Sequence, residues 1–359
     1  MSYLEIAHFC IIIPEYEDIS YDTQYQSCAN HLEFYKMTML SLLLHNLITI
    51  PMIVFFLGLS ISIFEINRFF FPKLQTFTKY FLLFCIGLKG GCVFLQHASF
   101  NLFSLLVVMV IWGLIQPLFS YGLLKKFTSI DSQTAAVVAA CFGSVSLMTF
   151  AAGINFLEKL QISYDSLVVP ILAVMEIPAI FTGLFLAKWK KLNIKDPKES
   201  VFLHIFLNKT IVVLFLGMGL GLIFYNFGLT DISQNILILF KPCLYFFLFF
   251  MGLAIGKQKK ELLQFSRSLT LFGCYMPLIG GVFGIFISWM FNLSVGTGTL
   301  LAILSASASY IAVPAAMKDI IPEAKEAIYM PLSIAIAFPF NILVGIPLYY
   351  CLALKFLCK

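Results

Sequence analysis

The sequence predicts an all-α membrane protein in which ten transmembrane helices form a 5+5 inverted repeat, with interruptions in helices 4 and 9. Three observations predict this fold. Hydrophobic residues make up 60% of the 359 residues and charged residues only 11%, whereas about a quarter of a soluble domain is charged. Ten stretches stay apolar over the roughly 20 residues that a spanning helix needs. Motifs of the first five stretches recur in the last five.

The ten predicted spans are joined by short loops, which leaves no room for a separate soluble domain. Each span is an apolar run with charged or polar residues near its ends. The spans cover residues 41–64, 77–96, 102–124, 133–157, 166–188, 201–225, 237–256, 268–291, 295–317 and 328–354.

Residues 1–36 precede the first span and form a polar, acidic tail. This tail lacks the basic start and the cleavage site of a signal peptide. It is either a short external appendage or a segment upstream of a true start at Met37 or Met39. Its cysteines, Cys10 and Cys28, could form a disulfide in an oxidising compartment. The other cysteines are scattered, mostly within spans, and are expected to pack as small apolar residues.

A basic loop, residues 189–200, separates the first five-helix repeat (37–188) from the second (201–359). Cytoplasmic loops of membrane proteins are enriched in Lys and Arg. Most cations of this chain, including those of the basic loop, fall on one side of the predicted topology. We therefore expect a multi-pass membrane protein with both termini outside. The net charge of +5 reflects this orientation, and no nucleic-acid partner is expected.

Spans 4 and 5 share short motifs with spans 9 and 10. Two serines recur 163 residues later, and two prolines recur 161 residues later. The pairs are Ser144 and Ser307, Ser146 and Ser309, Pro170 and Pro331, and Pro178 and Pro339. Because each repeat holds an odd number of spans, the two copies must lie in opposite orientations. This inverted repeat is typical of secondary transporters, which bind substrate where discontinuous helices meet.

Small polar residues in the middle of spans 4 and 9 predict that both helices are interrupted. They are Gly143, Ser144 and Ser146 in span 4, and Ser305, Ser307 and Ser309 in span 9. A break exposes N–H donors and the positive end of a helix dipole, which together attract an anion. The alternative is that these small residues only allow close packing between helices. Their recurrence in both repeats favours a site for a small anion.

Glu176 is the one carboxylate well inside a predicted span, and buried carboxylates in membranes are functional candidates. Its neighbour Pro178 frees a backbone carbonyl, so a cation or proton site is predicted there. The alternative is a carboxylate that reaches water or bonds to a neighbouring helix. The second repeat has Ala337 at the equivalent position. Gln116 and Asn341 are expected to form interhelical bonds and not to bind ligand.

No motif predicts an enzyme. The chain has no HExxH, no P-loop and no paired Cys/His spacing. No histidine or aspartate in a span is placed to activate Ser144 as a nucleophile. We therefore expect transport without a bound cofactor.

Four segments carry a resemblance to a known family. They are "IGLKGG" (86–91), "FGSVSLMTFAAG" through "ISYDSLVVPILAVMEIPAI" (142–180), "FKPCLYFFLFFMG" (240–252) and "SASASYIAVPAAMKDIIP" (305–322). Over about residues 40 to 350 the chain resembles the sodium-dependent bicarbonate transporters of cyanobacteria and their bacterial relatives. The resemblance implies a core part (spans 3–5 and 8–10) that moves against a gate part (spans 1, 2, 6 and 7) in a homotrimer. It also implies bicarbonate between the breaks of spans 4 and 9, with sodium beside it.

The chain departs from the family pattern at the breaks. Leu147 and Met148 stand where the family has Gly and Ser, and Tyr310 stands where it has Asp. Phe338 replaces a Thr in span 10. Glu176 stands where the family usually has Asp. Nearly all of the departures remove polar ligands and add bulk.

The sequence therefore predicts a secondary active permease for a small anion, with bicarbonate as the first candidate and sodium as the candidate coupling ion. Predicted substrate-binding residues are Gly143, Ser144, Ser146, Thr149, Ser307 and Ser309. Glu176 and Tyr310 are predicted to serve coupling or gating, and sodium is predicted near Ser146, Thr149, Ser305 and Ser309. One alternative is a proton-coupled permease for another small carboxylate. The other is a transport-inactive sensor or scaffold that engages a cytosolic regulator through residues 189–200.

Overall fold

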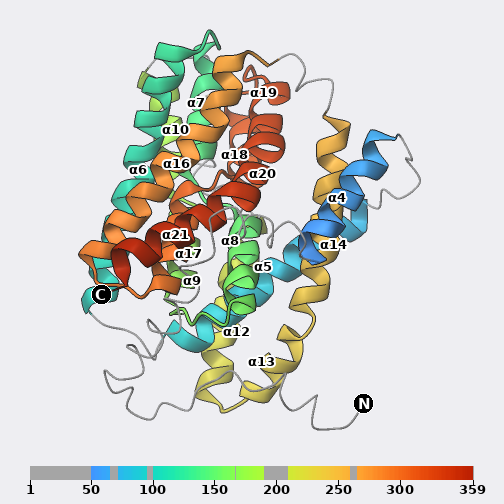
Figure 1. Cartoon of the computed structure of the whole chain (residues 1–359), viewed down its shortest axis with the longest axis vertical. Coiled ribbons are helices and arrows are strands. Elements are labelled where there is room, and N and C mark those ends of the chain that lie inside the picture. The colour runs from blue at the N-terminus through green and yellow to red at the C-terminus, as the bar shows by residue number, and fades with distance from the viewer. Residues whose placement is uncertain are drawn as a thin grey trace. The chain divides into compact units, whose positions relative to one another are not determined.

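The computed structural model describes residues 50–64, 72–94, 100–165, 167–189, 209–258 and 265–358 (Figure 1). These residues all belong to one compact unit, residues 43–359. They are helical and include no strand. The acidic tail with Cys10 and Cys28, and the basic loop beyond residue 189, lie outside the described residues.

Helices occur in all ten predicted ranges, and four of these ranges contain more than one helical piece. The first five ranges hold α4 (Ile50–Ile63), α5 (Pro72–Phe94), α6 (Phe100–Phe127), α7 (Ser132–Gly143) with α8 (Leu147–Lys159), and α9 (Val168–Met175) with α10 (Pro178–Trp189). The last five hold α12 (Lys209–Asn226), α14 (Phe240–Lys257), α16 (Arg267–Met290), α17 (Val295–Ala306) with α18 (Ala312–Ile320), and α19 (Glu326–Pro331), η2 (Leu332–Ala337), α20 (Phe338–Phe340), η3 (Asn341–Gly345) and α21 (Ile346–Leu357). A further helix, α13 (Thr230–Leu237), lies before the seventh range and shares only Leu237 with it.

Five helical segments among the described residues are long and apolar enough to cross a membrane. They are Phe103–Phe127, Ser132–Lys159, Asp231–Lys257, Arg267–Met290 and Glu326–Leu357. Large apolar side chains face outward on the helices, such as Phe103 (65% exposed) and Phe77 (60% exposed). Such exposure suits contact with lipid and is rare on soluble monomers. The structure therefore fits a multi-pass membrane protein, and the number of crossings stays a prediction.

Glycines bring two pairs of helices into close contact. α5 packs along α12, and α4 packs along α14. A Cβ on Gly58 would overlap the main-chain oxygen of Phe249, and one on Gly252 would overlap that of Phe55. Small residues at these crossings let two backbones approach, which is how helices associate in a bilayer. We call α4, α5, α12, α13 and α14 the gate helices.

The remaining helices, which we call the core helices, surround the two interrupted segments. The segment Ser132–Lys159 is the most enclosed candidate span, with 94% of its apolar window buried against 39% for Phe103–Phe127. α7 lies against α6, and α17 lies against α16. α8 contacts α17, and α18 contacts α7. The two interrupted segments are therefore enclosed by other helices and contact each other.

Candidate functional site

The helix of span 4 is interrupted at the residues that the sequence singled out. α7 ends at Gly143, and Ser144 and Ser146 adopt extended backbone before α8 begins at Leu147. The Ser146 hydroxyl caps α8 by accepting from the Thr149 N–H (3.3 Å) and from the Thr149 hydroxyl (2.9 Å). A Cβ on Gly143 would overlap the ring of Pro117 on α6. Glycine is therefore required where α7 ends. We call residues 144–146 the first break.

The helix of span 9 is interrupted over a longer stretch. α17 ends at Ala306, and α18 begins at Ala312. The Ser307 hydroxyl donates to the Leu304 carbonyl (2.9 Å). The Ser309 hydroxyl accepts from the Val313 N–H (3.4 Å). We call residues 307–311 the second break.

The two breaks are hydrogen-bonded to each other in both directions. The Ser146 N–H donates to the Ser307 hydroxyl (2.8 Å). The Ser309 N–H donates to the Cys141 carbonyl at the end of α7 (2.8 Å). Unpaired backbone groups are costly in hydrocarbon, so each break stabilises the other by supplying its missing partners.

Two buried amide side chains satisfy carbonyls at the end of α17. The Gln116 amide of α6 donates to the Ser305 carbonyl, and the Asn341 amide donates to the Ala306 carbonyl, both at 3.0 Å. The Tyr349 hydroxyl lies 3.1 Å from the Asn341 side-chain oxygen. The prediction that Gln116 and Asn341 form interhelical bonds is confirmed.

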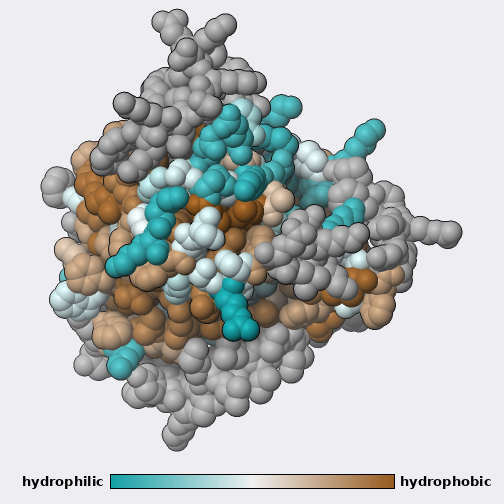
Figure 2. All heavy atoms as spheres, turned by 90° about the horizontal axis from the view of Figure 1, so that it is seen from above, coloured by the Kyte–Doolittle hydropathy of each residue, from teal (hydrophilic) through white to brown (hydrophobic). Residues whose placement is uncertain are grey.

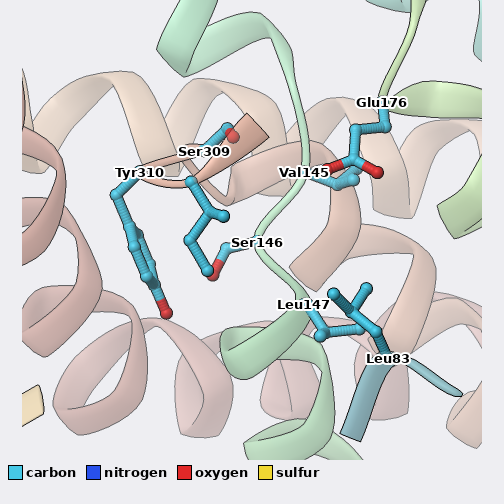
Figure 3. A pocket seen from close by; sticks show the side chains of 8 residues that line it. Leu83, Val145, Ser146, Leu147, Glu176, Ser309 and Tyr310 are labelled. Carbon is cyan, nitrogen blue, oxygen red and sulfur yellow. The ribbon is translucent and has the colours of Figure 1, made fainter. Parts of the chain in front are cut away.

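A small pocket lies where the breaks meet (Figure 3). Its lining comes from both breaks, from α8, from α5 and from the interruption of span 5. The lining residues are Leu83, Val145, Ser146, Leu147, Glu176, Ser309, Tyr310 and Ile311. Its cavity volume is about 20 Å³, room for one or two water molecules. We call it the break pocket.

Glu176 occupies a third interruption, between α9 and α10. α9 ends at Met175, and α10 begins at Pro178, which has no N–H to continue the helix. The Glu176 side chain is 7% exposed, and no described residue hydrogen-bonds to it. Lys79 of α5 is close enough for its charge to act on Glu176. The carboxylate therefore faces the pocket while a cation from a gate helix lies nearby.

Two departures from the family pattern contact each other. The rings of Tyr310 and Phe338 meet edge to face, with centroids 5.7 Å apart. Phe338 also lies 6.0 Å from Phe55 of α4. These aromatic rings fill space beside the second break and connect it to a gate helix.

The structure brings four of the predicted site residues into one pocket and leaves the others behind it. Ser146, Ser309, Glu176 and Tyr310 line the pocket, while Thr149 and Ser307 hydrogen-bond to Ser146. Gly143, Ser144 and Ser305 are buried away from the lining. The Ser144 and Ser305 hydroxyls have no hydrogen-bond partner among the described residues.

Sequence reasoning missed the contribution of α5. Leu83 lines the pocket, and Lys79 lies near Glu176, but neither stands in a break. Within the described residues, no cluster of three or more His, Cys, Asp or Glu could hold a metal ion.

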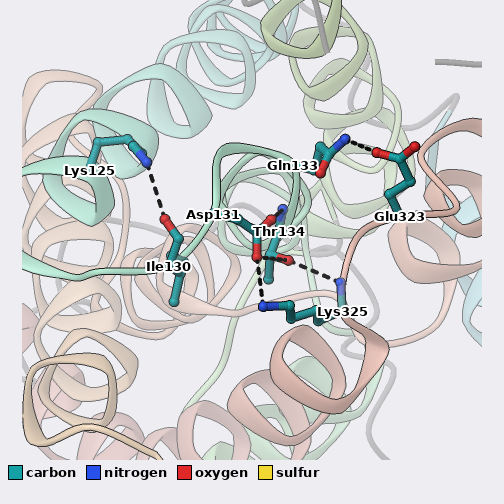
Figure 4. A network of polar contacts seen from close by, with 7 residues as sticks. All are labelled: Lys125, Ile130, Asp131, Gln133, Thr134, Glu323 and Lys325. Atoms are coloured by element: carbon teal, nitrogen blue, oxygen red, sulfur yellow. Dashed lines mark hydrogen bonds and ion pairs between the residues drawn. The ribbon is translucent and has the colours of Figure 1, made fainter. Parts of the chain in front are cut away.

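The start of α7 is tied to the start of α19 at one end of the core helices (Figure 4). Asp131 caps α7 by accepting from the Thr134 N–H (2.8 Å). The Thr134 hydroxyl accepts from the Lys325 N–H (3.0 Å), and the Lys325 ammonium lies 3.4 Å from Asp131. Burial raises the pKa of the Asp131 carboxyl, but the hydrogen bonds from Thr134 and the Lys325 charge outweigh it and hold this pKa below its usual value.

The start of α17 is tied in the same way to the segment before α9. Ser294 caps α17 by accepting from the Thr297 N–H (3.3 Å). The Thr297 hydroxyl accepts from the Asp165 N–H (2.8 Å). Ser294 and Thr297 follow Asp131 and Thr134 by 163 residues, the same separation as the serines of the breaks. Each interrupted helix is therefore fixed through a threonine to a helix of the other half.

Comparison of the sequence with known proteins places the chain in a family. No curated protein matches the chain. A sequence model of the Na+-dependent bicarbonate transporter superfamily matches residues 51–354. That match spans both breaks, the interruption at Glu176 and all of the described gate helices except the first residue of α4. The chain belongs to the Na+-dependent bicarbonate transporter superfamily.

Proposed function

We propose that the chain is a secondary active permease for a small anion, with bicarbonate as the first candidate, that works by alternating access. The observation that carries this proposal is the meeting of the two breaks. The Ser146 N–H donates to the second break, the Ser309 N–H donates to the end of α7, and both breaks line one pocket. The membership of a bicarbonate transporter superfamily supports the same substrate class.

The paired contacts support a 5+5 inverted repeat. Equivalent caps begin α7 and α17, and each is tied through a threonine to the other half. The gate helices pair in an exchanged manner, α4 with α14 and α5 with α12. These relations are expected if residues 37–188 and 201–359 are two copies of one unit inserted in opposite directions.

The breaks supply the chemistry for an anion. The first N–H groups of a helix lack an intrahelical acceptor. In α8 the Ser146 side chain caps Thr149, which leaves the N–H groups of Leu147 and Met148 for a ligand. Ile311 and Ala312 stand at the equivalent start of α18. These donors, with the hydroxyls of Ser146 and Ser309, would hold the anion in a site with little water.

Transport requires the pocket to open, because a volume of about 20 Å³ holds no more than one or two water molecules. The breaks belong to the core helices, and Leu83 belongs to gate helix α5. Movement of the core against the gate would separate Leu83 from Leu147 and Tyr310. Opening on alternate sides of the membrane would then carry the anion across.

Sodium is the candidate coupling ion. Hydroxyl and carbonyl oxygens would hold it, as in other sodium-coupled transporters with broken helices. Of the four predicted sodium residues, Ser146 and Ser309 line the pocket, and Thr149 contacts Ser146. The Ser305 carbonyl accepts from Gln116. The hydroxyls beside the first break are therefore better placed for sodium than Ser305.

Uptake of ¹⁴C-labelled bicarbonate into proteoliposomes tests this function. Uptake that falls when sodium is replaced by choline is the expected result. Uptake that is independent of sodium but driven by an inward proton gradient would support the second candidate instead. Normal insertion without uptake of any tested anion would overturn the proposal in favour of a sensor or scaffold acting through residues 189–200, which lie almost wholly outside the described residues.

The second candidate is a proton-coupled permease for another small carboxylate. Glu176 favours it, because this carboxylate faces the pocket without a hydrogen bond from a described residue. Tyr310, where the family has Asp, leaves Glu176 as the one carboxylate of the pocket lining. Glu176→Gln should then abolish proton-driven uptake, yet leave exchange of labelled for unlabelled substrate intact.

We further propose that the protein lies in a bacterial inner membrane as a homotrimer with both termini outside. The placement of basic residues supports this orientation. To test the orientation, protease is added to intact spheroplasts that carry the protein with an N-terminal tag. Cleavage of the tag is the expected result, and a tag protected in the cytoplasm would contradict the orientation.

A further inference from the structure

A groove on the outer surface of the core helices lies between the end of α6 and the first turns of α16. Its cavity volume is about 470 Å³, and it is lined by Phe127, Ser268, Leu271, Cys274, Tyr275 and Leu278. Residues 268, 271, 275 and 278 share one face of α16, because positions three and four apart are neighbours on a helix. We call this the α6–α16 groove.

The groove is apolar and open to the surroundings of the helices. Leu271 is 62% exposed and Phe127 is 54% exposed. The groove and the break pocket have no lining residue in common. The α6–α16 groove is therefore not part of the proposed transport site. In a bilayer, an apolar groove of this kind is suited to an acyl chain.

Two cations stand at the mouth of the groove. Lys126 precedes Phe127, and its ammonium lies 5.3 Å from the centre of the Phe127 ring. Arg267 precedes Ser268 and is exposed at the start of α16. α6 ends and α16 begins at the same end of the core helices (top of Figure 1), where Figure 2 shows hydrophilic side chains beside exposed apolar ones.

The positive charge at the mouth is not neutralised by the described part of the chain. Neither Lys126 nor Arg267 forms an ion pair with a described carboxylate. The carboxylates at this end have other partners: Asp131 pairs with Lys325, and Glu326 pairs with Lys318. Lys125 is held by the Ile130 carbonyl at 3.1 Å (Figure 4). Among the described residues that border the groove, Lys126 and Arg267 are thus the cations that can meet an anion.

We propose that the α6–α16 groove binds one anionic phospholipid, with an acyl chain along Leu271, Tyr275 and Leu278 and the phosphate at Lys126 and Arg267. Arg recognises phosphate oxygens through paired N–H donors, and Lys adds a point charge. Basic residues beside an apolar groove between spanning helices are a recognised arrangement for acidic lipids. The lipid would bridge α6 and α16, the two helices that pack against the ends of α7 and α17 at Gly143 and Ser305.

Native mass spectrometry of the full-length protein in mild detergent tests the proposal. Phosphatidylglycerol and phosphatidylcholine with identical acyl chains are titrated in parallel. We expect tighter binding of phosphatidylglycerol at one site per chain. Lys126→Gln with Arg267→Gln should lower its affinity roughly thirtyfold, since each cation near a membrane surface contributes about a factor of five for acidic lipid.

A matched control comes from the other end of the core helices. Lys355 stands over the ring of Phe356 at 5.7 Å, as Lys126 does over Phe127, but Phe356 does not line the α6–α16 groove. Lys355→Gln should leave phosphatidylglycerol binding unchanged. Equal affinity of the parent protein for both lipids, or an unchanged preference in the double variant, would overturn the proposal.

A second variant separates lipid from a neighbouring protein copy. Cys274→Phe fills the groove and should reduce the binding of both lipids without changing the oligomeric state. If this variant instead breaks up the oligomer and leaves lipid binding intact, the groove is an interface between copies and the lipid proposal is wrong. Because the double variant changes only exposed side chains, its folding is not at risk.

Discussion

The two breaks differ in how the backbone carbonyls at their edges find hydrogen-bond donors. The first break spans three residues, and the carbonyl of Cys141 at its edge is satisfied by the Ser309 N–H of the other break. The second break spans five residues, and the carbonyls at its edge are satisfied by amide side chains of Gln116 and Asn341. The first break therefore depends on the second, whereas the second also depends on two neighbouring helices.

This difference shows that the paired serines are not equivalent. Ser307 is engaged twice, as acceptor from the Ser146 N–H and donor to the Leu304 carbonyl. Its counterpart Ser144 has no hydrogen-bond partner among the described residues. The carboxylate near the pocket is also one-sided, because Glu176 has Ala337 as its counterpart. The two helix interruptions thus resemble each other in backbone but differ in their side chains.

The largest expected effect comes from adding bulk where the helices end. Gly143 lies against the ring of Pro117, and Gly280 of α16 lies against the Ser305 carbonyl at the end of α17. Gly143→Val and Gly280→Val should each destabilise the protein by about 3 kcal/mol or more. Gly280→Val should be worse, because a main-chain oxygen moves less readily than a proline ring. Thermal unfolding in detergent measures both.

Gly122→Val is the control for these variants, since nothing lies within 4 Å of its added Cβ. It carries the same change in chain entropy and side-chain volume at an open position of α6. Equal melting temperatures for all three variants would show that the helix ends are not closely packed at the breaks.

Removing the amides should have the next largest effect. Asn341→Leu deprives the Ala306 carbonyl of its donor and Tyr349 of its neighbour, and Gln116→Leu deprives the Ser305 carbonyl. A buried polar group left without its partner costs about 1–3 kcal/mol. Asn341→Leu should therefore cost more than Gln116→Leu in chemical denaturation. Neutral outcomes for both would mean that the second break does not need these helices.

Two serine variants test the difference in hydrogen bonding between the breaks. Ser307→Ala should destabilise by about 1 kcal/mol, since two hydrogen bonds are lost. Ser144→Ala should be neutral or slightly stabilising, because an unpaired buried hydroxyl is removed. A larger loss for Ser144→Ala than for Ser307→Ala in the same denaturation experiment would contradict the hydrogen-bond arrangement.

The smallest effect concerns pH and distinguishes the two helix caps. Asp131 has a pKa held below its usual value, so its stabilisation is present above an unfolded pKa near 3.9. This stabilisation is lost as the pH falls through the lower folded pKa. Asp131→Asn should flatten the pH dependence of the melting temperature at acidic pH. Ser294→Ala at the equivalent cap should lower stability without changing that dependence.

Local signals made parts of the fold predictable from the sequence. Gly143 and the two serines that follow it mark a helix end, and Pro178 marks another, because these residues disrupt helices through their own chemistry. The five pieces of the last range were not predicted, although Pro331, Pro339 and Pro347 each remove a backbone donor from that helix and account for the π-helical turns between them. Sequence spacing shows that a helix is disturbed, but not how it re-forms.

The pocket wall could not be predicted, because it is made by tertiary contacts. Leu83 and Lys79 sit in an unbroken helix with no local polar signal, and packing brings them beside Glu176. Likewise, Ser144 and Ser146 look alike in the sequence, yet Ser146 lines the pocket while Ser144 is buried away from it. The predicted ligand set was therefore too large at Gly143, Ser144 and Ser305, and it lacked the contribution of α5.

The most direct test compares two serines of similar burial near the second break. Ser309 lines the pocket, while Ser305 is buried behind it with no partner for its hydroxyl among the described residues. Initial rates of labelled bicarbonate uptake are measured for Ser309→Ala and Ser305→Ala at equal protein density. Ser309→Ala should lower uptake at low substrate about tenfold or more, as expected for losing a hydrogen bond to a charged ligand, and Ser305→Ala should match the parent protein. Equal rates for the two variants would contradict an anion held between the breaks.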